Sequence, residues 1–352
     1  MKNKMHDLII IGGGQSALAC AYYLRRTGLR YVLLDNQPDC GGAWRHAWDS
    51  LALFSPAEQS SLPGWWMPKS DHPFPTRAEV IDYLCRYEQR YEVPVLRPVD
   101  VSAVCREEAL FQLDTNKGRY LARAVISATG TWGKPFIPDI PGREAFAGVQ
   151  LHSAFYKNAG GFAGQKVLVV GEGNSGAQIL AEVSKVANTA WAVRRTPQFL
   201  PDDVDGRVLF NVASAKYYAE QRGEPFDAKK FGLGNIVMVP TVKEARARSV
   251  LEAAGQVASI HNTGVIWADG KEEDFDAIIW CTGFGYATGH LKPLGQQDER
   301  GRMPTDGTRS TEAPGLWLVG YGGWTGFASA TLIGVGRSAR QTVREVARWL
   351  SP

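Results

Sequence analysis

Residues 8–35 read LIIIGGGQSALACAYYLRRTGLRYVLLD, and this stretch decides the fold. It opens with a continuous apolar run at residues 8–11, which is typical of a strand covered on both faces. After three glycines, small or apolar residues recur at positions 17, 20, 21 and 24, the spacing of one helix face. A second apolar run follows at residues 31–34. The pattern predicts a strand, a glycine turn, a helix and a second, parallel strand.

The same pattern returns in residues 167–194, which read VLVVGEGNSGAQILAEVSKVANTAWAVR. Strand, glycine turn, helix face and second strand follow one another in the same order and phase. The alternative explanation is two unrelated glycine turns, but unrelated turns would not share all four features. We therefore predict two βαβ units that carry the Rossmann fingerprint for dinucleotides.

Each position of the fingerprint has a physical role. The first glycine makes the tight turn, the second lets the backbone approach a pyrophosphate, and the third, small residue packs the helix on the strand. The helix N-terminus adds N–H groups and a partial positive charge. The candidate phosphate-binding residues are Gly12, Gly14, Gln15, Ser16 and Ala17 in the first unit, and Gly171, Gly173, Asn174, Ser175 and Gly176 in the second.

The residue that ends the second strand differs in charge between the units. In the first it is Asp35, whose carboxylate can accept hydrogen bonds from ribose hydroxyls. In the second it is Arg194, followed by Arg195; guanidinium groups pair with phosphate and favour the 2′-phosphate of NADP. The alternatives are a turn or helix cap for Asp35 and a solvated turn for the two arginines.

Two further apolar runs, residues 124–130 and 277–283, end in Thr-Gly. One follows each fingerprint, which favours a strand that closes each nucleotide unit. A buried strand with a glycine turn is the alternative for either run alone. The candidate sites therefore also include Ala128, Thr129 and Gly130 in the first unit, and Cys281, Thr282 and Gly283 in the second.

Two dinucleotide sites of unequal charge indicate a flavin held in the first unit and a nicotinamide coenzyme that exchanges in the second. We predict an α/β fold with two Rossmann-like dinucleotide-binding domains. Residues 1–155 and 284–352 form the FAD-binding domain, and the NAD(P)H-binding domain, residues 156–283, is inserted into it.

Three motifs lead to a known family. Residues 146–157 match F-x-G-x-x-x-H-S-x-x-Y-K at every fixed position, residues 171–176 read G-x-G-N-S-G, and residues 41–44 read G-G-x-W. In these motifs the chain resembles flavin-containing monooxygenases, most closely their short, soluble bacterial members, and more distantly Baeyer–Villiger monooxygenases. The likeness extends over nearly the whole chain.

The resemblance implies FAD as cofactor and NADPH as reductant, and it leaves open how far NADH substitutes for NADPH. It implies that dioxygen forms a C4a-hydroperoxyflavin, which oxygenates a soft nucleophile: a sulfide to a sulfoxide, or an amine. Ketones are the substrates of the Baeyer–Villiger branch, whose signature has Trp where this chain has Tyr156, so heteroatom oxidation is favoured. The resemblance adds Gly42, Trp44, Val101 and Thr331 to the FAD site.

No side chain is assigned a catalytic step. His152, Tyr156 and Phe54 are candidates for an active-site or domain-closing role, and for His152 the second role is favoured. Residues 53–56 stand where longer members have an active-site asparagine, and Gly322-Gly323 stands where related flavoproteins carry Gly-Asp. Residues 326–334 are expected to start a helix whose N-terminus faces the flavin.

Two other functions fit the same motifs. One is an NAD(P)H-dependent flavin or quinone reductase, or an oxidase, of the same fold. The other, from a different class, is a non-catalytic redox sensor that binds both dinucleotides.

Composition excludes several classes of protein. With 39 Lys and Arg against 36 Asp and Glu, the net charge of +3 is too small for a dedicated nucleic-acid binder. Five scattered cysteines without C-x-x-C exclude a disulfide scaffold, a zinc knuckle and a thioredoxin-reductase-type redox pair, and no metal site is expected. No signal peptide or membrane span is apparent, so we expect a cytoplasmic protein in a reducing compartment. Its predicted partners are small molecules and dioxygen; a homodimer is left open.

Overall fold

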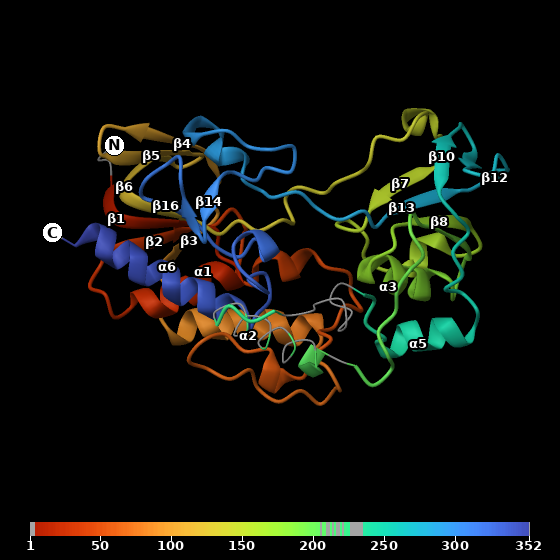
Figure 1. The fold of residues 1–352 in the computed structure, drawn as a ribbon, viewed down its shortest axis with the longest axis horizontal. Helices are drawn as coiled ribbons and strands as arrows, with labels where there is room; N and C mark the ends of the chain where they lie inside the picture. Colours follow the sequence, from red (N-terminus) through yellow and green to blue (C-terminus); the bar gives the residue numbers. More distant parts are fainter. Residues whose placement is uncertain are drawn as a thin grey trace. The chain divides into compact units, whose positions relative to one another are not determined.

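The computed structural model describes residues 4–351, except for 205, 209–211, 213–214, 216–218, 220–221 and 226–234. The chain forms two compact units, each built around its own sheet (Figure 1). The first unit comprises Met1–Arg45, Pro56–Lys134 and Phe284–Pro352, and the second comprises His46–Ser55 and Pro135–Gly283. The fold is α/β, and one unit is inserted into the other, as predicted.

The compact units divide the chain after Lys134 and after Gly283, whereas the predicted boundaries lie after residues 155 and 283. Strand β7 (Val149–His152) pairs in parallel with β13 (Ala277–Trp280), which places it in the second sheet. Residues 46–55 also belong to the second unit, where Asp49 N donates a 2.8 Å hydrogen bond to Lys157 O. The F-x-G-x-x-x-H-S-x-x-Y-K segment is therefore part of the second unit.

The first unit is organised by a parallel sheet in the order β3-β2-β1-β6-β16. Its first strand begins at Lys4, because the polar residues that precede the apolar run also pair with β6. Strands β14 and β15 extend one edge antiparallel, and β4 and β5 form an antiparallel meander on β6. The bounds are β1 Lys4–Ile11, β2 Tyr31–Leu34, β3 Val95–Leu96, β4 Val101–Glu107, β5 Leu110–Thr115, β6 Gly118–Ser127, β14 Thr305–Asp306, β15 Arg309–Ser310 and β16 Leu316–Leu318.

Helices α1 (Gln15–Leu24), α2 (Arg77–Arg90) and α6 (Val335–Leu350) belong to this unit, and α1 and α6 lie side by side (Figure 1). Helix α2 begins with a capping box, in which Thr76 and Glu79 satisfy each other's backbone N–H groups. The expectation of a helix start within residues 326–334 is wrong. That stretch folds into successive turns, and α6 starts only at Val335, after its N-cap Gly334.

The second unit has a sheet of four parallel strands in the order β7-β13-β8-β9, and helices α3 and α5 pack against each other. A separate antiparallel sheet, β10-β11-β12, completes the unit. The remaining bounds are β8 Lys166–Val170, α3 Asn174–Val183, β9 Asn188–Ala192, α5 Pro240–Ala247, β10 Val257–Ile260, β11 Gly264–Trp267 and β12 Glu272–Asp274.

The central strands are buried as their continuous apolar sequences predict. Leu8, Ile9 and Ile10 of β1 and Val167, Leu168 and Val169 of β8 are all 0% exposed. Among the described residues, no helix is long and apolar enough to span a bilayer. In the same part of the chain, no group of three or more His, Cys, Asp or Glu residues is arranged to hold a metal ion.

Candidate functional site

In each unit the candidate residues gather at the carboxyl edge of the parallel sheet, where α/β proteins bind their ligands. The first glycine of each turn has a positive φ, +108° at Gly12 and +128° at Gly171. A Cβ atom at Gly12 would lie 2.6 Å from the carbonyl oxygen of Ala128, and one at Gly171 would collide with the carbonyl oxygen of Cys281. Each fingerprint turn therefore packs against its Thr-Gly run, which confirms that the two runs close the two turns.

The first turn is also packed against the Gly41-Gly42 segment. Gly42 has φ +53°, and a Cβ atom there would lie 2.7 Å from Gly14 Cα. Gln15 joins the start of α1 to two other segments: it accepts a hydrogen bond from Trp44 Nε1 (3.1 Å) and donates one to Ala330 O (2.6 Å). The structure thus brings together the predicted residues of the first helix start and the G-G-x-W motif.

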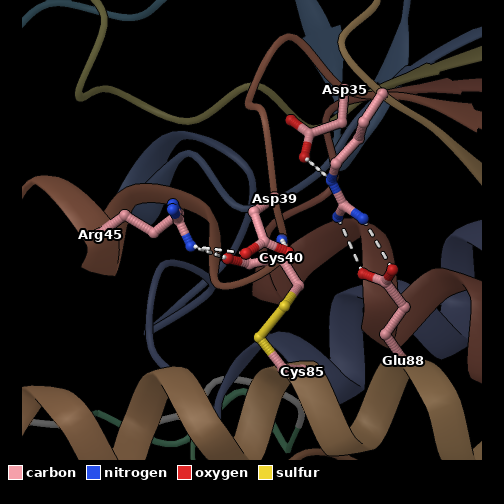
Figure 2. The surroundings of a disulfide bond; sticks show 7 residues. Asp35, Asp39, Cys40, Arg45, Cys85 and Glu88 are labelled. Atoms are coloured by element: carbon pink, nitrogen blue, oxygen red, sulfur yellow. Dashed lines mark hydrogen bonds and ion pairs between the residues drawn. A yellow bond between two sulfur atoms is a disulfide. The ribbon is translucent and has the colours of Figure 1, made fainter.

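Asp35 lies at the end of β2 and is only 3% exposed. Its Oδ2 accepts a 2.7 Å hydrogen bond from Arg97 Nε, and Arg97 in turn binds both oxygens of Glu88 on α2, at 2.7 and 2.8 Å (Figure 2). Burial raises the pKa of Asp35, and the hydrogen bond from Arg97 opposes that rise. Oδ1 accepts a long bond from Gln37 N (3.5 Å), so it retains capacity for a hydroxyl donor.

A disulfide joins Cys40, next to the Gly41-Gly42 segment, to Cys85 of α2, with a Cα–Cα distance of 5.2 Å (Figure 2). Arg45, five residues after Cys40, donates hydrogen bonds to the Asp39 carboxylate and to the carbonyl of Cys40. The expectation of a reducing compartment did not anticipate this bond, because cysteines 45 residues apart give no pairing signal in the sequence. The cytoplasmic location itself stays a prediction.

A buried chain of hydrogen bonds supports the first Thr-Gly turn. Thr129 Oγ1 donates to Ala287 O (2.7 Å), so the hydroxyl of Tyr321 must donate to Thr129 Oγ1 (2.7 Å). The hydroxyl of Tyr321 then accepts from Ser127 Oγ (2.6 Å), which accepts from His290 Nε2 (3.1 Å). This order places a proton on His290 Nε2. Burial lowers the pKa of His290 to about 4, so the ring is neutral at pH 7. The chain holds the turn at the end of β6 in one arrangement.

Four other predicted FAD residues occupy different surroundings. Ser16 and Ala17 are buried in the first turn of α1. Val101 begins β4 and packs in the hydrophobic core, which fits a structural role better than ligand contact. Thr331 Oγ1 donates to Ala328 O (2.8 Å) and accepts from Gly334 N (3.0 Å), so it shapes the turn before α6.

The second turn is open where a pyrophosphate would lie. A Cβ atom at Gly173 would meet no described atom within 4 Å. Ser175 and Gly176 lie in the first turn of α3, and Gly176 packs directly on the carbonyl of Gly171. Asn174 Oδ1 accepts a 2.8 Å bond from Val237 N, so this side chain fixes a neighbouring segment. An α-helix N-terminus behind an open glycine turn fits a dinucleotide phosphate.

The two arginines of the second unit are exposed, which leaves them accessible to a phosphate. Arg194 is 79% exposed and lies 3.7 Å from Glu172, the residue between the two glycines. On the neighbouring run, burial raises the pKa of Cys281, and Thr282 Oγ1 donates to Phe136 O. The Cys281 thiol is therefore protonated and unreactive at neutral pH.

The three candidates for an active-site or domain-closing role all lie in the second unit. His152 Nδ1 accepts from Ala154 N and Nε2 donates to Gly283 O, both at 3.0 Å, so the ring is neutral and braces the second Thr-Gly turn. Burial lowers its pKa. Tyr156 is fully buried and stacks on Phe162, and Phe54 O accepts from Gly206 N (2.8 Å). These contacts fit structural roles.

Sequence reasoning missed three groups of residues that surround the two turns. Two of the groups are distant in sequence from the motifs, so no spacing could identify them: Arg97 with Glu88, and Tyr321 and His290, which both bond to Ser127. Glu172 lies inside the second fingerprint, and its charge was the available signal.

The comparisons with known proteins agree with this geometry. Residues 9–320 match the family described as Pyridine nucleotide-disulphide oxidoreductase. The solved flavin-containing monooxygenase of Stenotrophomonas maltophilia is 51% identical and covers 99% of this chain and 100% of that one, with a TM-score of 0.90.

Two relatives known from sequence cover the chain almost as fully. The uncharacterized oxidoreductase CzcO of Bacillus velezensis is 31% identical over 97% of this chain and 99% of that protein. An indole-3-pyruvate monooxygenase of rice (Oryza sativa subsp. japonica) is 28% identical over 96% and 90%. The chain belongs to the pyridine nucleotide-disulphide oxidoreductase family, and over its whole length it is similar to flavin-containing monooxygenases.

Proposed function

We propose that the protein is a monooxygenase that uses FAD and NADPH to oxygenate soft nucleophiles, converting sulfides to sulfoxides and acting on amines. The observation that carries the proposal is the pair of glycine turns with opposite charges beside them. A buried carboxylate, Asp35, stands at the first turn, and two exposed arginines, Arg194 and Arg195, stand at the second. One chain therefore offers a site suited to FAD and a site suited to NADPH.

The first unit would hold FAD through its turn, its strand ends and the segments packed on them. Backbone N–H groups at Gly14 and Gln15 would face the pyrophosphate, and Asp35 Oδ1 would accept from the adenosine ribose. Gly42 and Trp44, which the structure places against Gly14 and Gln15, would close over the bound group. The Thr129-Gly130 turn would complete the site.

The second unit would hold NADPH with Gly173 at the pyrophosphate and Arg194 and Arg195 at the 2′-phosphate. A bound flavin would supply the redox and oxygen chemistry of the reaction, and NADPH would be its reductant. The chain itself binds both dinucleotides, keeps them oriented and keeps water from the reacting atoms. Because the cofactors would supply the reactive groups, His152 and Tyr156 can have structural roles in the second unit and need no catalytic one.

The resemblance also bears on the substrate. Tyr156 stands where the Baeyer–Villiger signature has Trp, which favours an electrophilic oxygen donor and a soft nucleophile over a ketone. A sulfide of the thioanisole type is therefore the test substrate, and a cyclic ketone is the comparison substrate.

The test is incubation of the FAD-loaded protein with NADPH, thioanisole and ¹⁸O₂, followed by mass spectrometry. We expect one ¹⁸O atom in the sulfoxide, NADPH consumption coupled to product, and little lactone from cyclohexanone. A Gly12→Ala variant, which should lose FAD, controls for oxidation by free flavin. Label found only in hydrogen peroxide and water would contradict the proposal and identify an oxidase or reductase. Failure to consume NADPH would favour the non-catalytic sensor.

A further inference from the structure

The second unit carries a carboxylate beside Arg194, two residues after the end of β9. Glu172 lies between the two glycines of the turn that follows β8, and β8 pairs with β9 up to Val170 and Ala192. Its Oε2 accepts a 3.4 Å hydrogen bond from the backbone N–H of Arg194, and its Oε1 lies 3.7 Å from Arg194 Nη2. The side chain is 27% exposed, so it is reachable from solvent.

This position is the one that an acidic strand-end residue takes in a dinucleotide site. In the first unit, Asp35, the residue after β2, occupies it. In the second unit the carboxylate comes from the glycine turn instead and lies beside the backbone of Arg194, the residue that corresponds in sequence to Asp35. A carboxylate there accepts hydrogen bonds from the 2′-hydroxyl of an adenosine ribose.

Glu172 and Arg194 therefore have opposite consequences for two coenzymes. The 2′-hydroxyl of NADH is a donor, and Glu172 can accept from it. The 2′-phosphate of NADPH is an acceptor that pairs with Arg194, but the phosphate must then draw Arg194 away from Glu172 and lie near its negative charge.

We propose that Glu172 is a specificity-determining residue that lets the second site accept NADH while weakening its hold on NADPH. This inference rests on the proposed function, because it requires that the second unit binds a nicotinamide coenzyme. The size of the effect is set by the exposure of the pair: Arg194 is 79% exposed, so solvent screens the interaction. We expect changes of about two- to fivefold in each affinity, in opposite directions.

The experiment compares the FAD-loaded wild type with Glu172→Gln, which removes the charge and keeps the size. Isothermal titration calorimetry with NADP⁺, NAD⁺, 2′,5′-ADP and ADP measures binding without turnover. We expect tighter binding of NADP⁺ and 2′,5′-ADP and weaker binding of NAD⁺. Glu172→Ala, which removes the acceptor as well, should weaken NAD⁺ further.

Glu244→Gln is the matched control, because Glu244 forms a 2.8 Å ion pair with Lys185 elsewhere in the same unit. It should leave the ratio of the two affinities unchanged. Suppose that the wild type binds both coenzymes. If Glu172→Gln then leaves the ratio of the NADP⁺ and NAD⁺ affinities unchanged, or shifts both affinities in the same direction, the role of Glu172 is refuted and the proposed function stands. If the wild type binds neither coenzyme, the proposed function falls together with it.

Discussion

Arg97 Nε donates a 2.7 Å hydrogen bond to Asp35 Oδ2, and the two side chains are 12% and 5% exposed. The same guanidinium binds both oxygens of Glu88, so one cation satisfies two carboxylates from different elements. The predicted ribose acceptor is therefore held in place by a residue that no motif contains. Its orientation depends on α2 as well as on β2.

The first prediction concerns this arrangement. Arg97→Met should lower the free energy of unfolding by about 3–5 kcal/mol, because it leaves two partly buried carboxylates without their cation. It should also weaken FAD binding, since Asp35 loses its orientation. Urea unfolding and flavin release measure the two effects. Arg86→Met, which removes an exposed partner of Asp82, is the control and should cost less than about 1 kcal/mol. Equal losses of unfolding free energy in Arg97→Met and Arg86→Met would contradict the claim that Arg97 neutralises two buried carboxylates.

The second prediction concerns the disulfide. Cys85→Ser should lower the stability of the first unit by about 2–4 kcal/mol, because the bond restricts the unfolded chain. It should also speed FAD release, since the Gly41-Gly42 segment loses its link to α2. Thermal unfolding and flavin fluorescence are the measurements. Dithiothreitol should have the same effect on the wild type and little on the variant, and Cys105→Ser should behave as wild type. A reductant effect that persists in Cys85→Ser would point to another thiol.

The third prediction separates the two sites. Gly12→Ala places a methyl group 2.6 Å from Ala128 O at a positive φ, so this variant should lose FAD. Gly171→Ala produces the corresponding clash with Cys281 O and should retain FAD while losing NADPH binding. Flavin absorbance after gel filtration and NADP⁺ titration measure the two affinities. Gly161→Ala, where a Cβ meets nothing within 4 Å, should affect neither. Loss of FAD from Gly171→Ala would overturn the assignment of the sites.

The fourth prediction concerns coenzyme preference. Replacing Arg194 and Arg195 with glutamine should raise KM for NADPH by roughly tenfold or more, because a charge-assisted bond contributes about 1.5–3 kcal/mol. KM for NADH should change little. Steady-state kinetics with both coenzymes provides the measurement, and raising the salt concentration should reduce the difference in the wild type. Equal effects on both coenzymes would support the solvated-turn interpretation.

The fifth prediction is a pH dependence. Burial lowers the pKa of His290 from 6.5 to about 4, so the unfolded chain binds this proton more tightly than the folded chain. The stability due to a neutral His290 is therefore complete above about pH 6.5 and is lost as the pH falls towards 4, by about 3 kcal/mol in total. Urea unfolding between pH 4.5 and 7.5 should show a smaller loss in His290→Gln. The exposed His72→Gln controls for removal of an imidazole. Identical pH profiles for wild type and His290→Gln would refute the assignment.

Much of the fold could be predicted because the decisive information is local. The apolar runs, the glycine spacing and the helix phase identified both βαβ units, and the structure places their strands within a few residues of the expected bounds. The likeness to flavin-containing monooxygenases could also be recognised from the sequence, since it rests on contiguous motifs. A relative 51% identical over 99% of the chain confirms it.

Most of the differences depend on contacts between distant segments, and the turns at residues 326–334 are a local exception. Residues 135–155 were assigned to the first unit because the motif that contains β7 does not indicate which sheet the strand joins, and only its pairing with β13 places it in the second. Residues 326–334 read as a helix start, but Ala328 has φ +54° and Thr331 bonds to its carbonyl, so the segment turns instead. The disulfide and the Arg97–Asp35 contact, like the pairing of β7 with β13, join residues far apart in sequence, so no local pattern predicted them.

The insertion of the second unit also affects how the protein is made. When residue 134 leaves the ribosome, the sheet of the first unit still lacks β16, and α1 still lacks its partner α6. At about 5–20 residues per second, residues 135–283 take on the order of ten seconds to synthesise. During this time the edge of β6 that will pair with β16 is uncovered, and an open strand edge invites association with other chains. We therefore expect chaperones to matter most during the synthesis of residues 135–283, while the first unit is incomplete. A circular permutant that begins near residue 284 would complete the first unit before the second is made, and so would remove this interval.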